Sequence, residues 1–215
     1  MNKVEILDII RETGVIAIMR AQSSGQLIAA ADAIKKGGVR AIEVTMTTPG
    51  ALGVIETAKA RYGSDVIFGA GSVLDAETAR ATILAGADFV VSPTLNLELI
   101  KLCNRYSIRV APGCYSPTEV LTGWQAGADF IKLFPASFGG PSLVKAILAP
   151  LPQVRIIPVG GVNLDTAADF IQKGAAALGV GSSLVNNKLL ESGDMDELTR
   201  RAEAFIEQVK KGRGL

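Results

Sequence analysis

The sequence predicts an α/β fold, a single (β/α)8 TIM barrel that spans residues 1–215 and carries an additional N-terminal helix. Short apolar or β-branched runs alternate with helical segments at a spacing of roughly 20 to 25 residues, which is typical of repeated βα units. The segment 85–93 also parallels the segment 126–134, and internal repeats indicate a repetitive architecture. A doubly wound open sheet is the alternative, but Ile18-Met19-Arg20-Ala21 stands where its glycine-rich first turn is expected.

Eight runs are expected to form the strands, because each is apolar or β-branched and is bounded by turn residues. They cover residues 15–20, 41–46, 66–72, 89–93, 109–114, 130–135, 155–161 and 177–184. Helices are expected between these runs, before the first of them, and over residues 195–210 at the end of the chain.

Helix starts are expected where a capping side chain precedes a helical pattern. Ser116-Pro117-Thr118-Glu119 combines a cap, a proline at the first helical position and a glutamate that completes a capping box. Thr48-Pro49, Asp75, Asn96 and Asn163 are further candidates for N-cap positions. These signals place helices shortly after strands, as a barrel of βα units requires.

The composition excludes several classes of function. A net charge of +1 gives no reason to expect nucleic acid or an acidic membrane as partner, and no apolar run approaches the ~20 residues of a membrane span. The N-terminus does not resemble a signal peptide, so a cytoplasmic location is expected. Cys103 and Cys114 are too few for a disulfide framework or a zinc site. Because histidine is absent, Ser-His and Cys-His nucleophile pairs and histidine-bound metals are excluded.

Lys132 is the strongest candidate for chemistry. It lies among large apolar residues in the run Phe130-Ile131-Lys132-Leu133-Phe134, and lysine is rarely buried without a partner. Burial disfavours the ammonium form, and the free amine is a nucleophile that condenses with carbonyl groups. The parallel segment carries Val91 at the same position, so the strand does not require a lysine. A structural lysine, paired with a carboxylate or facing water, is the alternative.

Glu43 is the expected partner of this lysine. In Ile42-Glu43-Val44-Thr45-Met46, alternation places Glu43 and Thr45 on one face of a strand and the apolar residues on the other. The apolar face is expected to meet the surrounding helices, which leaves Glu43 in the lumen. Interior layers draw on alternate strands, so Glu43 and Lys132 are expected to share one cavity. The alternative is a buried salt bridge, which stabilises a fold less well than apolar packing does.

Glycine-rich loops indicate an anion site. Active sites of these barrels lie at the carboxyl ends of the strands, and the loops after the seventh and eighth strands commonly bind phosphate. Gly160-Gly161 lies in one of these loops and Gly181-Ser182 in the other. Arg20 ends the first predicted strand and is expected to pair with a substrate carboxylate or phosphate, the alternative being a salt bridge at the rim.

These residues resemble the KHG/KDPG aldolase family of class I aldolases, and the resemblance runs over nearly the whole chain. It is carried by Ile42-Glu43-Val44-Thr45, Gly69-Ala70-Gly71-Ser72-Val73, Val91-Ser92-Pro93, Phe130-Ile131-Lys132-Leu133-Phe134-Pro135-Ala136, Gly160-Gly161-Val162 and Gly181-Ser182. The resemblance implies a Schiff-base lysine at Lys132, a proton-transferring glutamate at Glu43, and a homotrimer that needs neither metal nor cofactor.

Three positions depart from the family pattern. Thr47 stands where many members carry an arginine that helps to bind the pyruvate carboxylate, and Ser72 replaces a threonine while keeping the hydroxyl. Val159 stands where a threonine often assists phosphate binding. The residues expected to bind substrate are Arg20, Thr45, Thr47, Ser72, Pro93, Phe134, Gly160, Gly161, Gly181 and Ser182.

The resemblance implies reversible cleavage of 2-keto-3-deoxy-6-phosphogluconate to pyruvate and glyceraldehyde 3-phosphate, in carbohydrate metabolism of the Entner–Doudoroff type. Cleavage of 4-hydroxy-2-oxoglutarate to pyruvate and glyoxylate is a second candidate reaction. Two other functions are compatible with the fold: another phosphosugar isomerase or epimerase, and a non-catalytic barrel that binds phosphometabolites. The missing histidine counts against isomerases that use imidazole, and a binding protein would form no imine.

Overall fold

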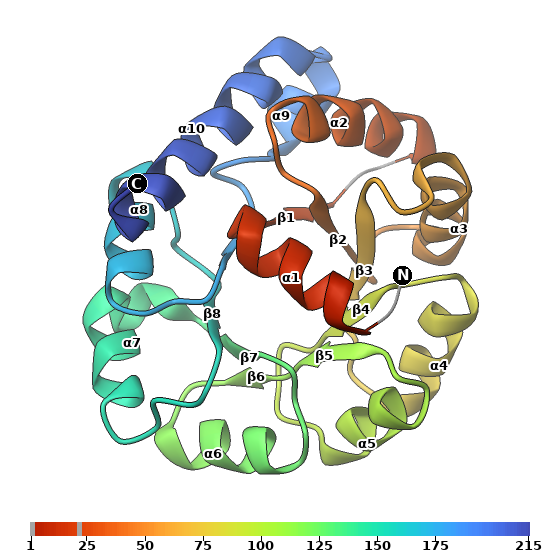
Figure 1. The fold of residues 1–215 in the computed structure, drawn as a ribbon. Helices are drawn as coiled ribbons and strands as arrows, with labels where there is room; N and C mark the ends of the chain where they lie inside the picture. Colours follow the sequence, from red (N-terminus) through yellow and green to blue (C-terminus); the bar gives the residue numbers. More distant parts are fainter. Residues whose placement is uncertain (1–2, 21–22) are drawn as a thin grey trace.

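The computed structural model describes residues 3–20 and 23–215 and has the α/β fold that the sequence predicts. Parallel strands form a curled inner layer, and the helices form an outer layer around them (Figure 1). The strands are β1 (Val15–Met19), β2 (Ala41–Thr45), β3 (Ile67–Gly71), β4 (Phe89–Val91), β5 (Arg109–Ala111), β6 (Gly113–Cys114), β7 (Ile131–Leu133), β8 (Ile156–Pro158) and β9 (Leu178–Val180). The helices are α1 (Lys3–Thr13), α2 (Ser24–Lys36), α3 (Ala51–Tyr62), α4 (Ala76–Leu84), α5 (Leu97–Arg105), α6 (Pro117–Gln125), η1 (Ala136–Phe138, a 3-10 helix), α7 (Gly140–Leu148), α8 (Leu164–Gln172), α9 (Asn187–Ser192) and α10 (Met195–Arg213).

The strands belong to two parallel sheets. Six strands pair in the order β5-β4-β3-β2-β1-β9, and three pair in the order β6-β7-β8. The sequence predicts one sheet of eight strands, and part of the difference arises at Pro112, which divides the predicted strand 109–114 into β5 and β6. Proline has no N–H to donate to a ladder, although its carbonyl oxygen accepts a bond from the Lys132 N–H at 2.9 Å. An isolated bridge between Val159 and Gly179 connects the two sheets.

Several strands end earlier than predicted. The predicted strand 155–161 is observed as β8, three residues long, and the predicted strand 177–184 is observed as β9, also three residues long. Gly160 and Gly161 have φ angles of 89° and 79°, in the left-handed region that no strand uses, so the chain turns away from the sheet there. The glycine-rich segments are therefore loops that follow the strands.

Most of the predicted helix starts are observed. Ser116 and Glu119 form the predicted capping box, and the side chains of Asp75, Asn96 and Asn163 each accept a bond from a backbone N–H in the first turn. The prediction at Thr48-Pro49 is wrong. The N-cap of α3 is Gly50 with a φ of 67°, whereas the Thr48 N–H and hydroxyl both lie against Thr45. Thr48 stabilises a turn after β2 and the helix begins two residues later.

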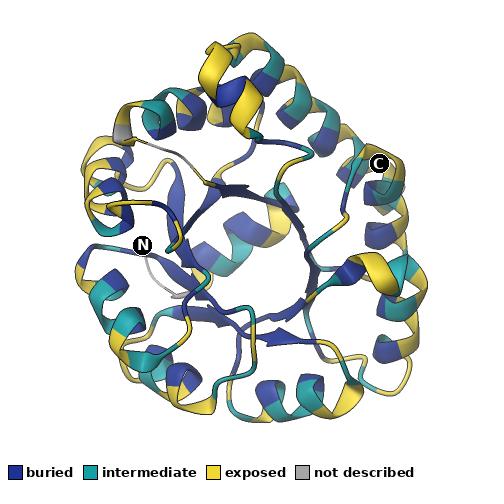
Figure 2. Cartoon of the chain, turned by 180° about the vertical axis from the view of Figure 1, so that it is seen from behind, coloured by how far each residue is buried: buried dark blue, intermediate teal, exposed yellow. Residues whose placement is uncertain are grey.

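The buried residues form two cores, one on each side of the strands. The larger core lies between the strands and the outer helices. The smaller core lies inside the ring of strands, where Ile6, Ile9 and Ile10 of α1 pack with Phe89 and Phe130. These aromatic residues lie at the beginnings of β4 and β7, so α1 covers the amino ends of the strands, as Figure 2 shows through the ring. The carboxyl ends are left for the loops that carry polar residues.

The repeated segments share one stabilising device. Asp88 accepts a hydrogen bond from the Phe68 N–H at 3.0 Å, and Asp129 accepts one from the Val110 N–H at 3.1 Å. Asp88 therefore joins the start of β4 to β3, and Asp129 joins the start of β7 to β5. Asp88 also forms an ion pair with Lys59, and Asp129 forms one with Arg109 at 3.3 Å. 

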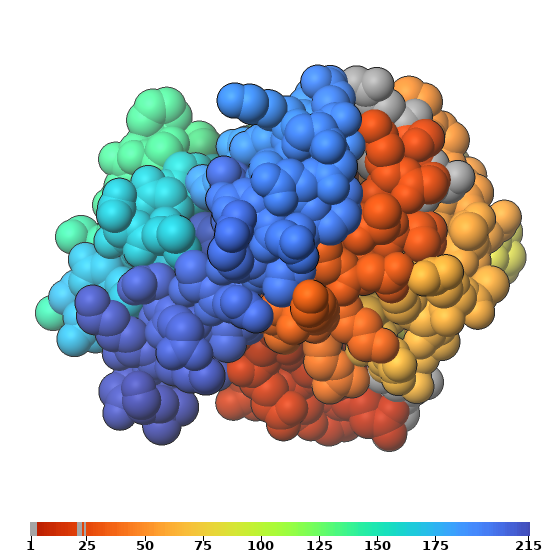
Figure 3. Space-filling model, turned by 90° about the horizontal axis from the view of Figure 1, so that it is seen from above, coloured from red at the N-terminus to blue at the C-terminus, as the bar shows by residue number. Residues whose placement is uncertain are grey.

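The last helix closes the outer layer against the first units of the chain. The Thr199 hydroxyl of α10 donates to the carbonyl oxygen of Ala33 in α2 at 3.1 Å. A Cβ atom at Gly37 would lie 2.5 Å from the Cβ of Ala202, so a side chain there would prevent this packing. Figure 3 shows the C-terminal segment directly beside the N-terminal one. Helices α10 and α2 thus complete one circular layer of helices, and α1 lies outside this layer.

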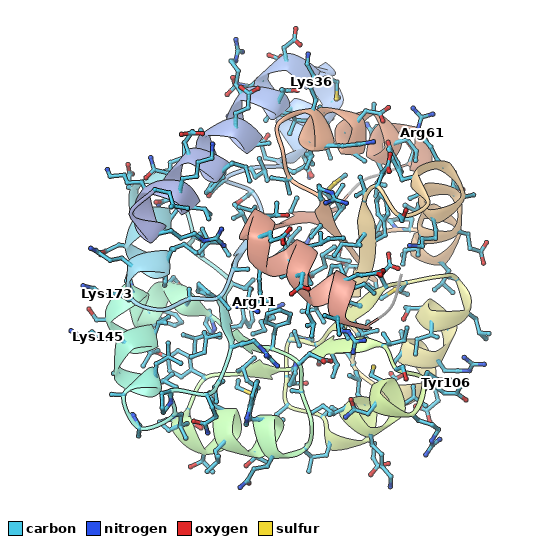
Figure 4. All side chains as sticks on the ribbon, in the orientation of Figure 1. Arg11, Lys36, Arg61, Tyr106, Lys145 and Lys173 are labelled. Carbon is cyan, nitrogen blue, oxygen red and sulfur yellow. The ribbon has the colours of Figure 1, made fainter. Side chains whose placement is uncertain are left out.

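Charged side chains lie mainly on the periphery of this layer. Lys36, Arg61, Lys145 and Lys173 project from the outer helices, whereas Arg11 lies on α1 near the axis (Figure 4). Within residues 3–20 and 23–215, no helix is long and apolar enough to cross a membrane.

Candidate active site

Lys132 lies at the centre of β7, and only 6% of its surface is exposed. Its neighbours in register are Gly113 in β6 and Ile157 in β8. Its Nζ atom lies 5.0 Å from the centroid of the Phe134 ring, which is within cation–π range. The amine is therefore held in a mainly apolar setting with an aromatic ring beside it.

Glu43 lies in β2 and is 2% exposed. Its neighbours Ile42 and Val44 pack in the outer core, so Glu43 faces the lumen. One interior cavity is lined by Ile10, Ile16, Glu43, Phe89, Val90, Val91, Arg109, Val110, Ala111, Phe130, Lys132, Ile157, Val159 and Gly179. The structure thus places Glu43 and Lys132 in the same cavity, together with Val91 of the repeated segment.

Burial gives Glu43 unusual acid–base properties. It raises the pKa of the Glu43 carboxyl above its ordinary value, and the positive charges of Lys132 and Arg20 act in the opposite direction without overcoming it. A carboxyl group with a raised pKa keeps its proton to a higher pH, so its two protonation states are closer in free energy near neutrality. Glu43 is therefore suited to accept a proton and to return it.

A second cavity lies at the carboxyl ends of β8, β9 and β1. It is lined by Ile18, Arg20, Phe134, Val159, Gly160, Gly161, Val162, Asn163, Gly179, Gly181, Ser182 and Ser183. It brings together six of the predicted site residues from four different strand ends. A Cβ atom at Gly161 would lie 2.7 Å from the Cβ of Ser137, so glycine is required for the close approach of this loop to η1. The loop backbone and the Arg20 guanidinium form a wall rich in hydrogen-bond donors, suited to an anion.

The two cavities are neighbours. Val159 and Gly179 line both of them. A Cβ atom at Gly179 would lie 2.6 Å from the side chain of Val159, so the valine fills the space that the glycine leaves. The wall that the two cavities share is therefore apolar.

Four predicted residues line neither of these two cavities: Thr45, Thr47, Ser72 and Pro93. Thr45 is fully buried, and its hydroxyl lies 2.9 Å from that of the exposed Thr47. Ser72 has a φ of 57°, an uncommon conformation for a residue other than glycine. Pro93 lies so close to Gly113 that a Cβ atom there would be 2.2 Å from the Pro93 carbonyl oxygen.

Three polar residues of these cavities were not among the predicted site residues: Arg109, Asn163 and Ser183. Asn163 was expected only as a helix cap, and it fills that role while also lining the glycine-rich cavity. Arg109 was expected only as the start of a strand, yet it is 1% exposed and lines the lysine cavity. The available signal for Arg109 was a charged residue at the start of an apolar run, followed 20 residues later by the aspartate of the repeated segment, Asp129. Among the described residues, no three His, Cys, Asp or Glu side chains gather so as to hold a metal ion.

Known proteins match this chain over nearly its whole length. The family description "KDPG and KHG aldolase" matches residues 6–201. The chain is 30% identical to the 2-dehydro-3-deoxy-phosphogluconate aldolase of Haemophilus influenzae, over 96% of this chain and 97% of that protein. It is 32% identical to the 2-dehydro-3-deoxy-6-phosphogalactonate aldolase of Escherichia coli, over 91% of this chain and 94% of that protein.

A solved structure agrees with this assignment. The KDPG aldolase of Legionella pneumophila, described with pyruvate captured at low pH as a covalent carbinolamine intermediate, superposes with a TM-score of 0.86. The sequences are 28% identical, and the match covers 92% of this chain and 96% of that one. The chain belongs to the KDPG and KHG aldolase family.

Proposed function

We propose that this protein is a class I aldolase that cleaves 2-keto-3-deoxy-6-phosphogluconate reversibly to pyruvate and glyceraldehyde 3-phosphate. The observation that carries the proposal is the shared cavity of a buried lysine and a buried glutamate, Lys132 and Glu43. The Legionella pneumophila relative, captured with pyruvate as a carbinolamine, supports a covalent route through an amine. The glycine-rich cavity next to it supports a substrate with a distal anion.

The reaction begins at the amine. The Lys132 Nζ atom attacks the C2 ketone of the substrate to give a carbinolamine, which takes up a proton and loses water to form an iminium; the final hydrolysis releases that proton again. The C4 hydroxyl then loses its proton, the C3–C4 bond breaks, and its electron pair moves toward the iminium nitrogen. The aldehyde leaves and an enamine remains on the lysine. A proton added at C3 and the hydrolysis of the imine release pyruvate and restore the amine.

Glu43 moves the protons in this scheme. Its carboxylate accepts the C4 hydroxyl proton, directly or through one water, and the resulting acid is the source of the proton that C3 receives. Its buried position with a raised pKa supports this role, because the group must be a base in one step and an acid in the next. Phe134 and Pro93 shield the imine from water, and the ring beside the lysine amine supports this for Phe134.

The distal phosphate lies in the glycine-rich cavity in this proposal. The backbone N–H groups of Gly160, Gly161 and Gly181, the Ser182 hydroxyl and the Arg20 guanidinium bind it. Thr45, Thr47 and Ser72 bind the pyruvate carboxylate by way of the turns after β2 and β3. Because Val159 offers no hydroxyl, the phosphate depends on the remaining donors.

The two sheets make up one closed (β/α)8 barrel in this proposal. A single residue, Pro112, separates β5 from β6, and the Val159–Gly179 bridge connects β8 with β9. The ring of strands in Figure 2 supports closure. The protein assembles as a homotrimer in this proposal, as the family resemblance implies, and light scattering should give three times the mass of the chain. The proposed location is cytoplasmic, as the composition led us to expect.

Trapping of the imine tests the proposed function. Incubation with pyruvate and sodium borohydride should reduce an imine to a stable secondary amine, which adds a reduced pyruvyl group to Lys132. Peptide mass spectrometry locates the modified residue. A phosphosugar isomerase and a non-catalytic binding protein both predict no adduct, so an unmodified Lys132 would refute the aldolase. A panel that measures pyruvate release from the phosphorylated substrate and from 4-hydroxy-2-oxoglutarate then identifies the preferred aldehyde.

Replacement of Glu43 by glutamine should separate imine formation from cleavage. Glutamine keeps the size of the side chain but cannot take up a proton, so kcat should fall by roughly 10² to 10⁴-fold, the range of general acid–base catalysis. Borohydride trapping with pyruvate should still label Lys132. A Glu43→Gln enzyme with wild-type kcat would show that another group moves the protons.

The same substitution should raise stability in a pH-dependent way. The folded state binds the Glu43 proton more tightly than the unfolded chain, so the contribution of Glu43 to stability is complete below the ordinary pKa of 4.5. That contribution is lost as the pH rises through the raised folded-state pKa. Glu43→Gln should therefore unfold at a higher urea concentration than the wild type at pH 8, and the gap should narrow toward pH 4.5. A gap that widens on acidification would contradict the direction of the shift.

Arg20 should contribute to binding of the substrate's phosphate group and not of its carboxylate. Arg20→Met is expected to raise KM for 2-keto-3-deoxy-6-phosphogluconate by roughly 10-fold, because one charge-assisted hydrogen bond at an exposed position is lost. The matched substrate is 2-keto-3-deoxygluconate, which lacks only the phosphate and should show little change. Equal effects on both substrates would assign Arg20 to the carboxylate end instead.

A further inference from the structure

Gly71 ends β3 and is paired in register with Thr45 of β2. Its φ angle is not among the positive values of the chain, so the backbone there is open to any L-residue. A conformational requirement therefore does not explain the glycine. The lack of a side chain has to be explained by the space around it.

That space is filled by Glu43. A Cβ atom at Gly71 would lie 1.8 Å from Oε1 of Glu43, 2.4 Å from Cδ and 2.6 Å from Cγ, and these are its three nearest atoms outside the adjacent residues. The carboxylate thus lies over the Gly71 Cα, in a slot of β3 that only glycine leaves open. Ordinary contact begins at 3.4 Å, so even an alanine would force Oε1 to move by about 1.6 Å.

Gly69 shows that the slot is specific to the position. It lies two residues earlier on the same face of β3, and a Cβ atom there would lie 2.2 Å from the ring of Phe89. The two glycines thus create two neighbouring spaces in the lumen, one for an aromatic ring of the inner core and one for the carboxylate. Only the second space contains a group that takes part in the proposed chemistry.

We propose that Gly71 is a positioning residue for the reaction, which fixes where the Glu43 carboxylate stands in the cavity. The inference rests on the proposed function, because the position of the carboxylate matters only if Glu43 transfers protons. Burial against β3 also keeps the carboxyl away from water, which agrees with its raised pKa. Displacement of a catalytic group by about 1 Å costs roughly 10²-fold in rate, so the slot accounts for an effect of that size.

Gly71→Ala is the direct test. It should lower kcat by roughly 10²-fold with little change in KM, because the substrate and Lys132 are untouched. Borohydride trapping with pyruvate should proceed as in the wild type. A wild-type kcat, or a folded variant that no longer traps pyruvate, would overturn the proposal.

A second comparison shows whether Gly71 acts through Glu43. Glu43→Ala removes the three atoms that a Cβ at position 71 would meet, so adding Gly71→Ala to that variant should change neither kcat nor the urea midpoint. Gly69→Ala is the matched control, because its clash is with Phe89 and its loss of stability should persist in the Glu43→Ala background. If both alanines behave alike in that background, Gly71 does not position Glu43.

The stability comparison involves no turnover. It therefore shows whether Gly71 is in contact with Glu43, even if Gly71→Ala is too unstable for kinetic measurements in the otherwise native chain. Trapping on Lys132 in the wild type decides the proposed function separately, so the failure of one idea is distinguishable from the failure of the other.

Discussion

Lys132→Met should abolish cleavage, with kcat/KM lower by roughly 10⁴-fold or more, because no other group in the cavity can form an imine with the ketone. Methionine has a similar length and is apolar, and the repeated segment already carries an apolar Val91 at the equivalent position of the lumen. The variant should therefore fold with a urea midpoint close to that of the wild type. Coupled assay of pyruvate release gives the rate, and circular dichroism gives the stability.

Lys132→Arg is the matched control for charge. Arginine keeps a cation at the site but does not act as an amine nucleophile at neutral pH. If Lys132 acted only by attracting the substrate carboxylate, the arginine variant would retain a large part of the activity. The Schiff-base mechanism requires both variants to be inactive and both to escape labelling by pyruvate and borohydride.

Asp129→Asn should destabilise the fold strongly, by about 3 to 5 kcal/mol, because it removes the carboxylate that is paired with a buried arginine. Arg109 is 1% exposed and its guanidinium lies 3.3 Å from the Asp129 carboxylate. Asparagine keeps an oxygen to accept the Val110 N–H, so the change acts mainly on the charge. Urea denaturation followed by circular dichroism measures the loss.

Asp88→Asn provides the control within the same chain. Asp88 has the same place in the repeat and accepts a comparable bond from the Phe68 N–H, but its cation, Lys59, has a side chain that is 28% exposed. Water can solvate that lysine after the change, so the loss should be about 1 kcal/mol or less. Equal losses for the two variants would show that burial of Arg109 has no special cost.

Local sequence rules predicted the positions of helices and strands better than they predicted how the strands pair into sheets. The caps at Asp75, Asn96 and Asn163 follow from the chemistry of one side chain and the next turn, so they were accessible from sequence. At Thr48-Pro49 two local preferences competed, and the turn that binds Thr48 to Thr45 prevailed over a helix start. Pro112 has no backbone N–H, so its effect on the predicted strand depends on whether a neighbouring strand would have accepted a hydrogen bond from that position. The pairing of the strands decides this, and it is not encoded locally.

The candidate site divides in the same way. Alternation along a strand predicted that Glu43 and Lys132 face one cavity, because side-chain direction in a strand has a fixed period. No such period holds after the strand ends, so the sequence did not predict that Thr47 and Ser72 line neither of the two cavities. The contact between Gly71 and Glu43 could not be predicted from the sequence, because it depends on the direction in which the Glu43 side chain extends from β2 over the neighbouring strand β3.

The position of helix α1 determines the order in which we expect substrates to bind and products to leave. Its isoleucines fill the amino ends of the strands, and Ile10 lies at the wall of the cavity that holds Lys132. Helix α1 therefore closes the cavity at the amino ends of the strands, and we expect its mouth at the carboxyl ends. In the proposed reaction the keto acid is attached to Lys132 and lies deeper than the aldehyde, so we expect the aldehyde to leave first during cleavage. In the condensation direction pyruvate has to enter first, and excess aldehyde should inhibit by blocking the mouth.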